Sequence, residues 1–195
     1  MADSAVDDVI TNLAIAAGRG DRAAANSLIR STQRDVWRFL VYLVGRTEAE
    51  DLTQETFVRA LLSAHRFTAR SNARTWLLAI ARRVAADHFR AAATRPKIAS
   101  EQDWQEAAEQ ATSPHLPGLD DTVAINLAVR TLSRDRRDAF VLTQVLGLGY
   151  AEAAQVCGCP VGTIRSRVAR ARRDLVEVLA PTQRPPGVRS ASGPA

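Results

Sequence analysis

The chain has 195 residues, of which 46% are hydrophobic and 24% are charged, which is typical of a soluble protein with a packed core. Its two cysteines form no Cys-x-x-Cys pair and no Cys/His cluster, so neither a disulfide framework nor a metal site is expected. The acidic N-terminus does not resemble a signal peptide and the longest apolar run, residues 76–81, is too short to span a bilayer, so we expect a cytoplasmic protein with reduced thiols.

Charge is distributed in blocks. Residues 61–98 carry eight basic groups and one acidic group, residues 99–121 carry six acidic groups and no basic one, and residues 122–195 carry 11 basic and five acidic groups. Two basic blocks separated by an acidic stretch predict two polyanion-binding modules joined by a linker that avoids polyanions. The abundance of Ala, Leu, Val and Arg, without period-two alternation, favours helices over strands.

These patterns predict an all-α fold, with two small helical domains joined by a flexible acidic linker. We expect an N-terminal arm and helix at 1–20, a first domain at 21–95, the linker at 96–120, a second domain at 121–180 and a disordered tail at 181–195. The linker is rich in proline and holds at most a short helix at 101–111.

In the first domain, we expect a frayed acidic arm over residues 1–9 and then helices at about 7–18, 21–44, from 47 to the loop at 64, and 73–92. Gly45 closes the second of these helices. Thr47 with Glu50 is the pattern of a capping box and predicts the start of the third.

The helix after Thr47 has two distinct faces. Ala49, Thr53, Thr56, Phe57 and Ala60 lie on the side expected to face the core. The outer side consists of Asp51, Gln54, Glu55, Val58 and Leu62. Carboxylates and an amide beside exposed Val and Leu are unusual for a merely solvated surface, so a protein partner is the favoured interpretation.

A polar, basic loop over residues 64–72 holds Phe67 among cationic side chains. In the helix that follows, the expected inner side is Leu77, Ile80, Ala81, Val84 and His88. The expected rim is Arg74, Arg82, Arg83, Asp87 and Arg90. Trp76 suits either the core or a stacking platform for a base, and its helical spacing favours the core.

Residues 150–175 carry the strongest functional signal. In the second domain, helices are expected at about 121–131 and 133–145, the latter with Ser133 as N-cap. A short Ala-rich helix then ends at Gly158, which suits a left-handed C′ position, and Pro160 suits the first turn of a further helix. Two helices joined by such a turn predict a helix-turn-helix.

The second helix of this motif divides by face. Its apolar stripe is Ile164, Val168, Ala171 and Leu175. Its opposite face consists of small and basic residues: Gly162, Thr163, Arg165, Ser166, Ala169, Arg170 and Arg173. With Arg167 and Arg172, the helix has five arginines within nine residues. A solvated basic helix is the alternative, but the glycine turn and the small-residue face favour DNA.

Three stretches of the sequence together resemble a known family. Asp-Leu-Thr-Gln-Glu-Thr-Phe at 51–57 and Ala-Arg-Thr-Trp-Leu-Leu-Ala-Ile-Ala-Arg at 73–82 resemble region 2 of an extracytoplasmic-function sigma factor. Residues 139–175, with Gly-Tyr-Ala-Glu-Ala-Ala and Gly-Thr-Ile-Arg-Ser-Arg, resemble region 4 of the same family. The resemblance covers about residues 20–95 and 120–178 in the family's order.

The resemblance implies a subunit of bacterial RNA polymerase that directs the enzyme to promoters by binding the −35 duplex and by melting and capturing the −10 element. It implies contacts with the clamp helices of the largest polymerase subunit at Asp51, Gln54, Glu55 and the adjoining Val58. It implies −10 contacts at Phe67, Arg70, Ser71, Asn72, Arg82, Arg83, Asp87 and Arg90. It implies −35 contacts at Gly162, Thr163, Arg165, Ser166, Arg167, Arg170 and Arg173.

Two positions depart from the family. Cys159 stands where a small polar residue often precedes the recognition helix, and Arg83 replaces a common Asn of the −10 helix. Family members are often held inactive by an anti-sigma protein. Whether this chain has such a partner, or packs its own two domains together instead, stays open from the sequence.

No bond-making chemistry is expected of this chain. The run Gly147-Leu148-Gly149 lacks the lysine and the strand of a phosphate-binding loop, and no carboxylate pair suggests acid–base work. We therefore expect no cofactor, and a protein that acts through binding energy. A helix-turn-helix regulator without sigma activity is the alternative and needs a sensor or dimer domain, while a nucleic-acid enzyme needs a metal-binding carboxylate cluster.

Overall fold

The computed structural model describes residues 2–94 and 119–179, and every regular element in these ranges is helical, which confirms the all-α prediction. Most of the expected linker, its short helix at 101–111 and the expected tail lie outside the described residues. Residues 119 and 120, predicted as the end of the linker, already belong to a helix. The elements are α1 (Ala2–Gly18), α2 (Arg22–Val44), α3 (Arg46–Ser63), the 3₁₀ turn η1 (Ala64–Arg66), α4 (Ala73–Thr94), α6 (Leu119–Thr131), α7 (Arg134–Phe140), the π turn η2 (Val141–Val145), α8 (Tyr150–Cys157) and α9 (Val161–Leu179).

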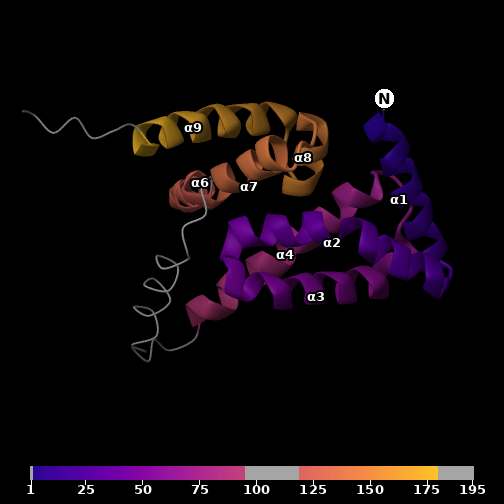
Figure 1. Ribbon diagram of the computed structural model, residues 1–195. Coiled ribbons are helices and arrows are strands. Elements are labelled where there is room, and N and C mark those ends of the chain that lie inside the picture. The colour runs from indigo at the N-terminus through magenta and orange to yellow at the C-terminus, as the bar shows by residue number, and fades with distance from the viewer. Residues whose placement is uncertain (1, 95–118, 180–195) are drawn as a thin grey trace, which may run out of the picture.

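The first domain is a bundle of α2, α3 and α4, with α1 packed against its end (Figure 1). The predicted frayed arm was wrong, because α1 begins at Ala2 and buries Ile10 and Ala14.

The predicted capping box at the start of α3 was also wrong. Gly45, with φ of 107°, joins α2 directly to α3, which begins at Arg46 without a side-chain cap. Thr47 is therefore already inside the first turn. The start of α2 does have a side-chain cap, since Asp21 Oδ1 accepts a hydrogen bond from Ala24 N at 3.0 Å.

The second domain contains α6 to α9. The helix expected at 133–145 is split, because α7 ends at Phe140 and the chain continues as a π turn. The wider turn is closed by a bond of 2.9 Å from Leu146 N to Val141 O. Ser133 is the N-cap residue of α7, as predicted, but its side chain makes no cap hydrogen bond. The nearby carbonyls of Arg130 and Leu132 are taken by the guanidinium of Arg137.

The helix-turn-helix forms as predicted from its glycine. Gly158 has φ of 64° and ψ of 40°, the left-handed conformation that a side chain would strain. Cys159 N then donates to Ala154 O at 3.1 Å, which satisfies a carbonyl at the end of α8. The predicted apolar stripe of α9 is confirmed, since Ile164, Val168, Ala171 and Leu175 are all buried.

The two domains pack on each other. Helix α8 lies against α4, and α6 and α7 lie against α2 (Figure 1). One continuous apolar core includes Leu78 and Ala85 of α4 together with Ala153 and Val156 of α8. Helix α9 lies on the far side of the second domain from α3 (Figure 1). Among the described helices, none combines the length and apolarity that crossing a bilayer requires.

Candidate nucleic-acid interfaces

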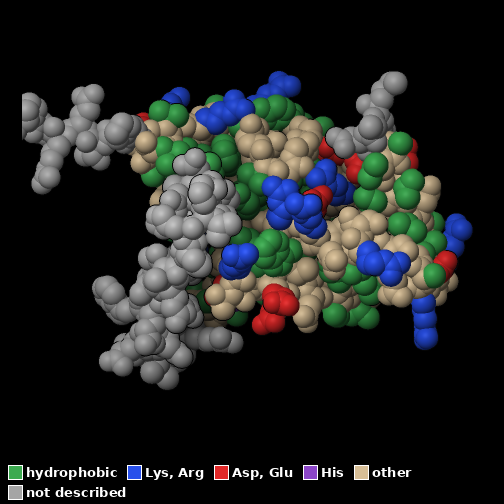
Figure 2. Space-filling model, in the orientation of Figure 1, with side chains coloured by type: hydrophobic (Ala, Val, Ile, Leu, Met, Phe, Trp, Pro, Cys, Tyr) green, Lys and Arg blue, Asp and Glu red, His purple; other side chains and the backbone are tan. Residues whose placement is uncertain are grey.

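The outer face of α9 is open to solvent. Its predicted DNA-facing residues are exposed, apart from a half-buried Thr163: Gly162, Arg165, Ser166, Ala169, Arg170 and Arg173. Basic side chains gather along the upper edge of the molecule, over α9, in Figure 2. Small side chains between guanidinium groups let the helix backbone approach a surface closely, as a helix in a DNA major groove must do.

Arg167 faces inward, unlike these residues. Its guanidinium pairs with Asp135, and its Nη1 donates to Cys159 Sγ at 3.5 Å. Arg172 Nη2 donates to Gln144 Oε1 at 2.6 Å. Arg167 thus joins the start of α7 to the turn before α9, so in this arrangement its guanidinium binds residues of its own domain.

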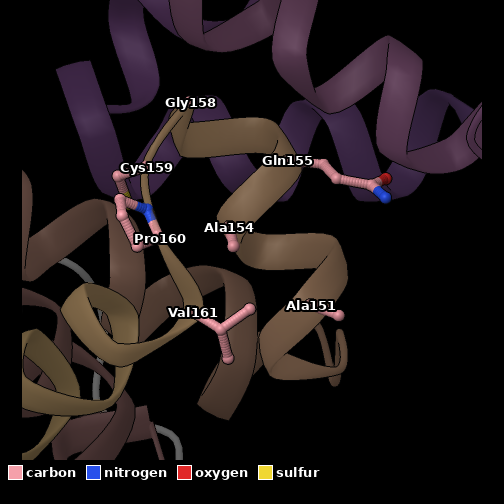
Figure 3. A pocket seen from close by; sticks show the side chains of 7 residues that line it. All are labelled: Ala151, Ala154, Gln155, Gly158, Cys159, Pro160 and Val161. Atoms are coloured by element: carbon pink, nitrogen blue, oxygen red, sulfur yellow. The ribbon is translucent and has the colours of Figure 1, made fainter.

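A shallow hollow of about 530 Å³ lies beside the helix-turn-helix turn (Figure 3). Ala151, Ala154 and Gln155 of α8 line one side, and the turn with the start of α9 lines the other. The lining is small and mostly apolar, so the hollow adds room for close approach to α9 but supplies little specific chemistry.

The loop between η1 and α4 holds its aromatic residue against the helix. The rings of Phe67 and Trp76 lie 4.8 Å apart with a tilt of 35°. Trp76 is half-buried and packs on the core, as its spacing predicted, but it also supports Phe67. Arg70 is exposed, Ser71 is half-buried, and Ala69 adopts a φ of 53°, which is strained for a residue with a Cβ.

Asn72 is the N-cap of α4 and has its hydrogen-bonding groups in use. Its Oδ1 accepts from Thr75 N at 2.7 Å. Its Nδ2 donates to Asp7 Oδ2 at 3.1 Å and to Glu152 Oε1 at 2.6 Å. Because Glu152 belongs to α8, a residue predicted to capture a base is tied to the second domain.

The side of α4 that faces the second domain carries a stripe of residues that contact that domain. Arg74 Nη2 donates to Leu146 O at 2.7 Å, while its Nε donates to Asp35 Oδ2 at 2.7 Å within the first domain. Leu78 and Ala85 of the same stripe are fully buried. At the end of the stripe, the guanidinium of Arg134 lies 5.2 Å from the centre of the Phe89 ring.

Arg82 makes the most buried of these contacts. Its Nε donates to Asp138 Oδ2 at 2.6 Å, and Asp138 is 0% exposed. Burial raises the pKa of Asp138, and Arg82 opposes that rise. Burial would lower the pKa of Arg82, but the Asp138 carboxylate outweighs it, so the pKa is raised and Arg82 stays charged. The other oxygen, Asp138 Oδ1, is buried without a hydrogen-bond partner among the described residues.

The opposite rim of α4 is exposed. Arg83 and Arg90 face solvent, and Arg90 forms an ion pair with Asp87. Asp87 Oδ2 also accepts from Arg59 Nη1 at 2.6 Å, and Arg59 Nε donates to Glu55 Oε1 at 2.7 Å. The hydrogen bond from Arg59 lowers the pKa of Asp87, with a further contribution from Arg90.

The outer face of α3 is open, as the sequence predicted. Asp51, Gln54 and Val58 are exposed and Glu55 is half-exposed. Leu61 and Leu62 extend this face with further exposed apolar surface. The second domain does not cover it, since its packing partners in the first domain are α2 and α4.

Sequence reasoning missed the residues of the second domain that hold α4. Asp135, Asp138 and Leu146 were not singled out, and Arg74 and Arg82 were placed on an open rim. A signal was present in the spacing of Arg74, Leu78, Arg82, Ala85 and Phe89, which recur at four, four, three and four. That spacing marks a second face of α4, which packs against the second domain.

Comparisons with known proteins agree with this geometry. Residues 28–95 match the model of Sigma-70 region 2, and residues 122–175 match that of Sigma-70, region 4. The chain belongs to the extracytoplasmic-function group of the sigma-70 family. A sigma factor of this group binds core RNA polymerase and directs it to promoters, and a regulator without sigma activity is not favoured.

Curated relatives share most of the length of this sigma factor. It is 50% identical to the ECF RNA polymerase sigma factor SigC of Mycobacterium tuberculosis over 170 residues, which cover 87% of this chain and 91% of the relative. It is 33% identical to the RNA polymerase sigma-H factor of Pseudomonas aeruginosa, over 85% of this chain and 91% of that protein.

Solved structures show the same fold. The sigma factor RpoE of Bartonella quintana, in complex with the anti-sigma factor NepR, is 30% identical with a TM-score of 0.65, over 79% of this chain and 95% of that one. CnrH, in complex with the cytosolic domain of CnrY, has a TM-score of 0.66 at 24% identity, over 88% of this chain and 97% of that one, and supports the fold alone.

Proposed function

We propose that this sigma factor works through three surfaces on three helices. The outer face of α3 binds the clamp helices of polymerase through Asp51, Gln54, Glu55 and Val58. The loop before α4, with the exposed rim of α4, captures the opened −10 strand. The outer face of α9 reads the −35 duplex through Arg165, Ser166, Arg170 and Arg173, with Gly162 and Thr163 at the close approach.

The observation that carries this proposal is the separation of the surfaces. The open face of α3 and the open face of α9 lie on different sides of the molecule (Figure 1), so a polymerase and a duplex can be held at once. Binding energy suffices for opening. Melting costs roughly 1.4 kcal/mol per base-pair step, and stacking of a captured base returns about 1–3 kcal/mol. We therefore assign no catalytic step to this chain and place its work in the cytoplasm, with polymerase.

We also propose that the closed arrangement is an inactive form of the free chain. Asn72 and Arg82, assigned to −10 DNA, are held by Glu152 and Asp138 of the second domain. These carboxylates bind the same side-chain groups that we assign to DNA phosphates and bases. Binding of α4 to the second domain and binding of α4 to −10 DNA therefore exclude one another. An anti-sigma protein, such as those bound to the solved relatives, would add to this closure from outside.

Reconstitution with core RNA polymerase tests the assignment of surfaces. Asp51→Arg is expected to abolish polymerase association while the open α9 still binds duplex DNA, whereas Arg173→Ala keeps polymerase association and loses −35-dependent initiation. The three readouts are association with core polymerase, binding of duplex DNA, and transcription from a promoter selected from random DNA by the wild-type holoenzyme. If both variants lost the same activities to the same extent, the assignment of separate surfaces would be wrong.

A further inference from the structure

Arg59 lies between the face of α3 assigned to polymerase and the rim of α4 assigned to DNA. Its Nε donates to Glu55 Oε1 at 2.7 Å on its own helix. Its Nη1 donates to Asp87 Oδ2 at 2.6 Å on α4, a residue 28 positions away. The second oxygen of Asp87 pairs with Arg90. Four side chains of alternating charge thus run from α3 across to the end of the α4 rim.

Asp87 is an unsuitable DNA contact by itself. It lies on the rim of α4 between Arg83 and Arg90, where a bare carboxylate would repel a phosphate strand. Both of its oxygens are covered, one by Arg59 and one by Arg90. Glu55, Arg59, Asp87 and Arg90 together carry no net charge, so removing Arg59 would leave a net charge of −1 at the rim of α4.

The bond from Arg59 to Asp87 decides how much positive charge Arg90 can offer to DNA. With Arg59 bound to Asp87, that carboxylate is shared between two guanidinium groups, so it neutralises Arg90 only in part, and the Arg90 side chain is 78% exposed. Without Arg59, Asp87 and Arg90 form a neutral i,i+3 pair on one helix, and no charge is left for a phosphate. We propose that Arg59 is a positioning residue for capture of the opened strand, which holds Asp87 so that Arg90 can contact the DNA backbone.

An arginine is required at this position by geometry. The planar guanidinium offers Nε and Nη1 to two carboxylates on two different helices, which a lysine ammonium cannot do in the same orientation. The network also raises the pKa of Arg59, chiefly through Asp87 and then Glu55, so its charge is held. As partly exposed ion pairs, these contacts contribute little to folding, so a structural role alone predicts little change in any activity.

This proposal rests on the assigned −10 function of α4 and is tested in the holoenzyme. The probe is the labelled non-template strand of a promoter selected by the wild-type holoenzyme, bound at saturating core polymerase over a series of salt concentrations. Each phosphate contact to a single strand contributes about 0.7 to the slope of log affinity against log salt. Arg59→Gln is expected to lower the slope by about that amount, and Arg59→Lys by less. Arg22→Gln, which removes an exposed charge at the start of α2, is the matched control and leaves the slope unchanged.

A double-mutant cycle separates positioning from direct contact. In an Asp87→Asn background, Arg90 is already free, so adding Arg59→Gln is expected to change nothing. An equal loss in both backgrounds would mean that Arg59 touches DNA itself, and a loss in neither would mean that the network is only a solvated ion-pair chain; either result overturns the proposal. Failure of the wild-type holoenzyme to open any promoter would instead overturn the proposed function, before the Arg59 variants are compared.

Discussion

Arg82 of α4 donates its Nε to Asp138 of α7 across the domain interface at 2.6 Å, and it is the one group on α4 that meets a fully buried carboxylate of the other domain. Asp138 is fully buried next to Ala139 of the continuous apolar core, whereas Arg82 is partly exposed. A buried carboxylate is tolerated there because Arg82 compensates its charge, so the two residues require one another for closure. The contact also uses a guanidinium that we assign to the −10 DNA strand.

Asp138→Asn is expected to favour the open form. The change keeps the side-chain size but removes the charge that compensates Arg82. Arg82 is only partly buried, so water can resolvate it in part, and we expect closure to weaken by about 1–3 kcal/mol, or roughly fivefold to 150-fold in the closed-to-open ratio. Small-angle scattering of the full chain should show a larger radius of gyration.

The matched control is Asp174→Asn, which removes the same charge from an ion pair with Arg136 inside the second domain. It is expected to leave the radius of gyration unchanged. Equal compaction in wild type and Asp138→Asn, combined with an unaltered affinity for single-stranded DNA, would contradict the closed, inactive form.

Two arginines of α9 are expected to respond differently to the same substitution. Arg170→Ala removes an exposed guanidinium, so it should weaken duplex binding and lower its salt dependence without affecting stability. Arg167→Ala removes a guanidinium bonded to Asp135 and Cys159, so it should lower the melting temperature of the chain. Thermal unfolding and duplex titration of both variants check this, and the reverse assignment would show that Arg167 faces DNA.

Ile164→Ala is expected to destabilise the chain by about 2–5 kcal/mol, because Ile164 is fully buried on the inner face of α9 and truncating its side chain leaves a cavity. Val176→Ala, on the same helix but with its side chain largely exposed, should change stability by about 0.5 kcal/mol or less. Urea denaturation measures both. Comparable losses would mean that the buried face of α9 is misassigned.

Cys157 is expected to resist alkylation. Burial raises the pKa of its thiol to about 12, so at pH 8 the reactive thiolate is scarce, and labelling should be slower by about a thousandfold than for an ordinary thiol. The rate should rise as the pH approaches 12. The half-buried Cys159 of the same chain is the internal reference, and site-resolved mass spectrometry after iodoacetamide treatment gives both rates. Equal rates in the native chain would contradict the burial of Cys157.

The fold and the outward faces of single helices followed from sequence, because each depends on spacing within one element. Gly158 and the stripe from Ile164 to Leu175 are local signals, and the structure confirms them. The capping box at Thr47 failed because a local pattern can be overridden by how two helices join. The partners of Arg74 and Arg82 could not be predicted, since they lie 72 and 56 residues away and depend on how the domains dock.

The apolar core that runs from α4 into α8 also constrains how the molecule melts. Leu78 and Ala153, one from each domain, are both fully buried in this core. Separating the domains therefore exposes apolar side chains of both domains to water. Calorimetry of the wild-type chain should therefore record a single cooperative endotherm. A variant whose two domains no longer pack together should show two smaller endotherms. An open molecule without polymerase would also expose apolar patches, and exposed apolar patches promote aggregation in concentrated solution.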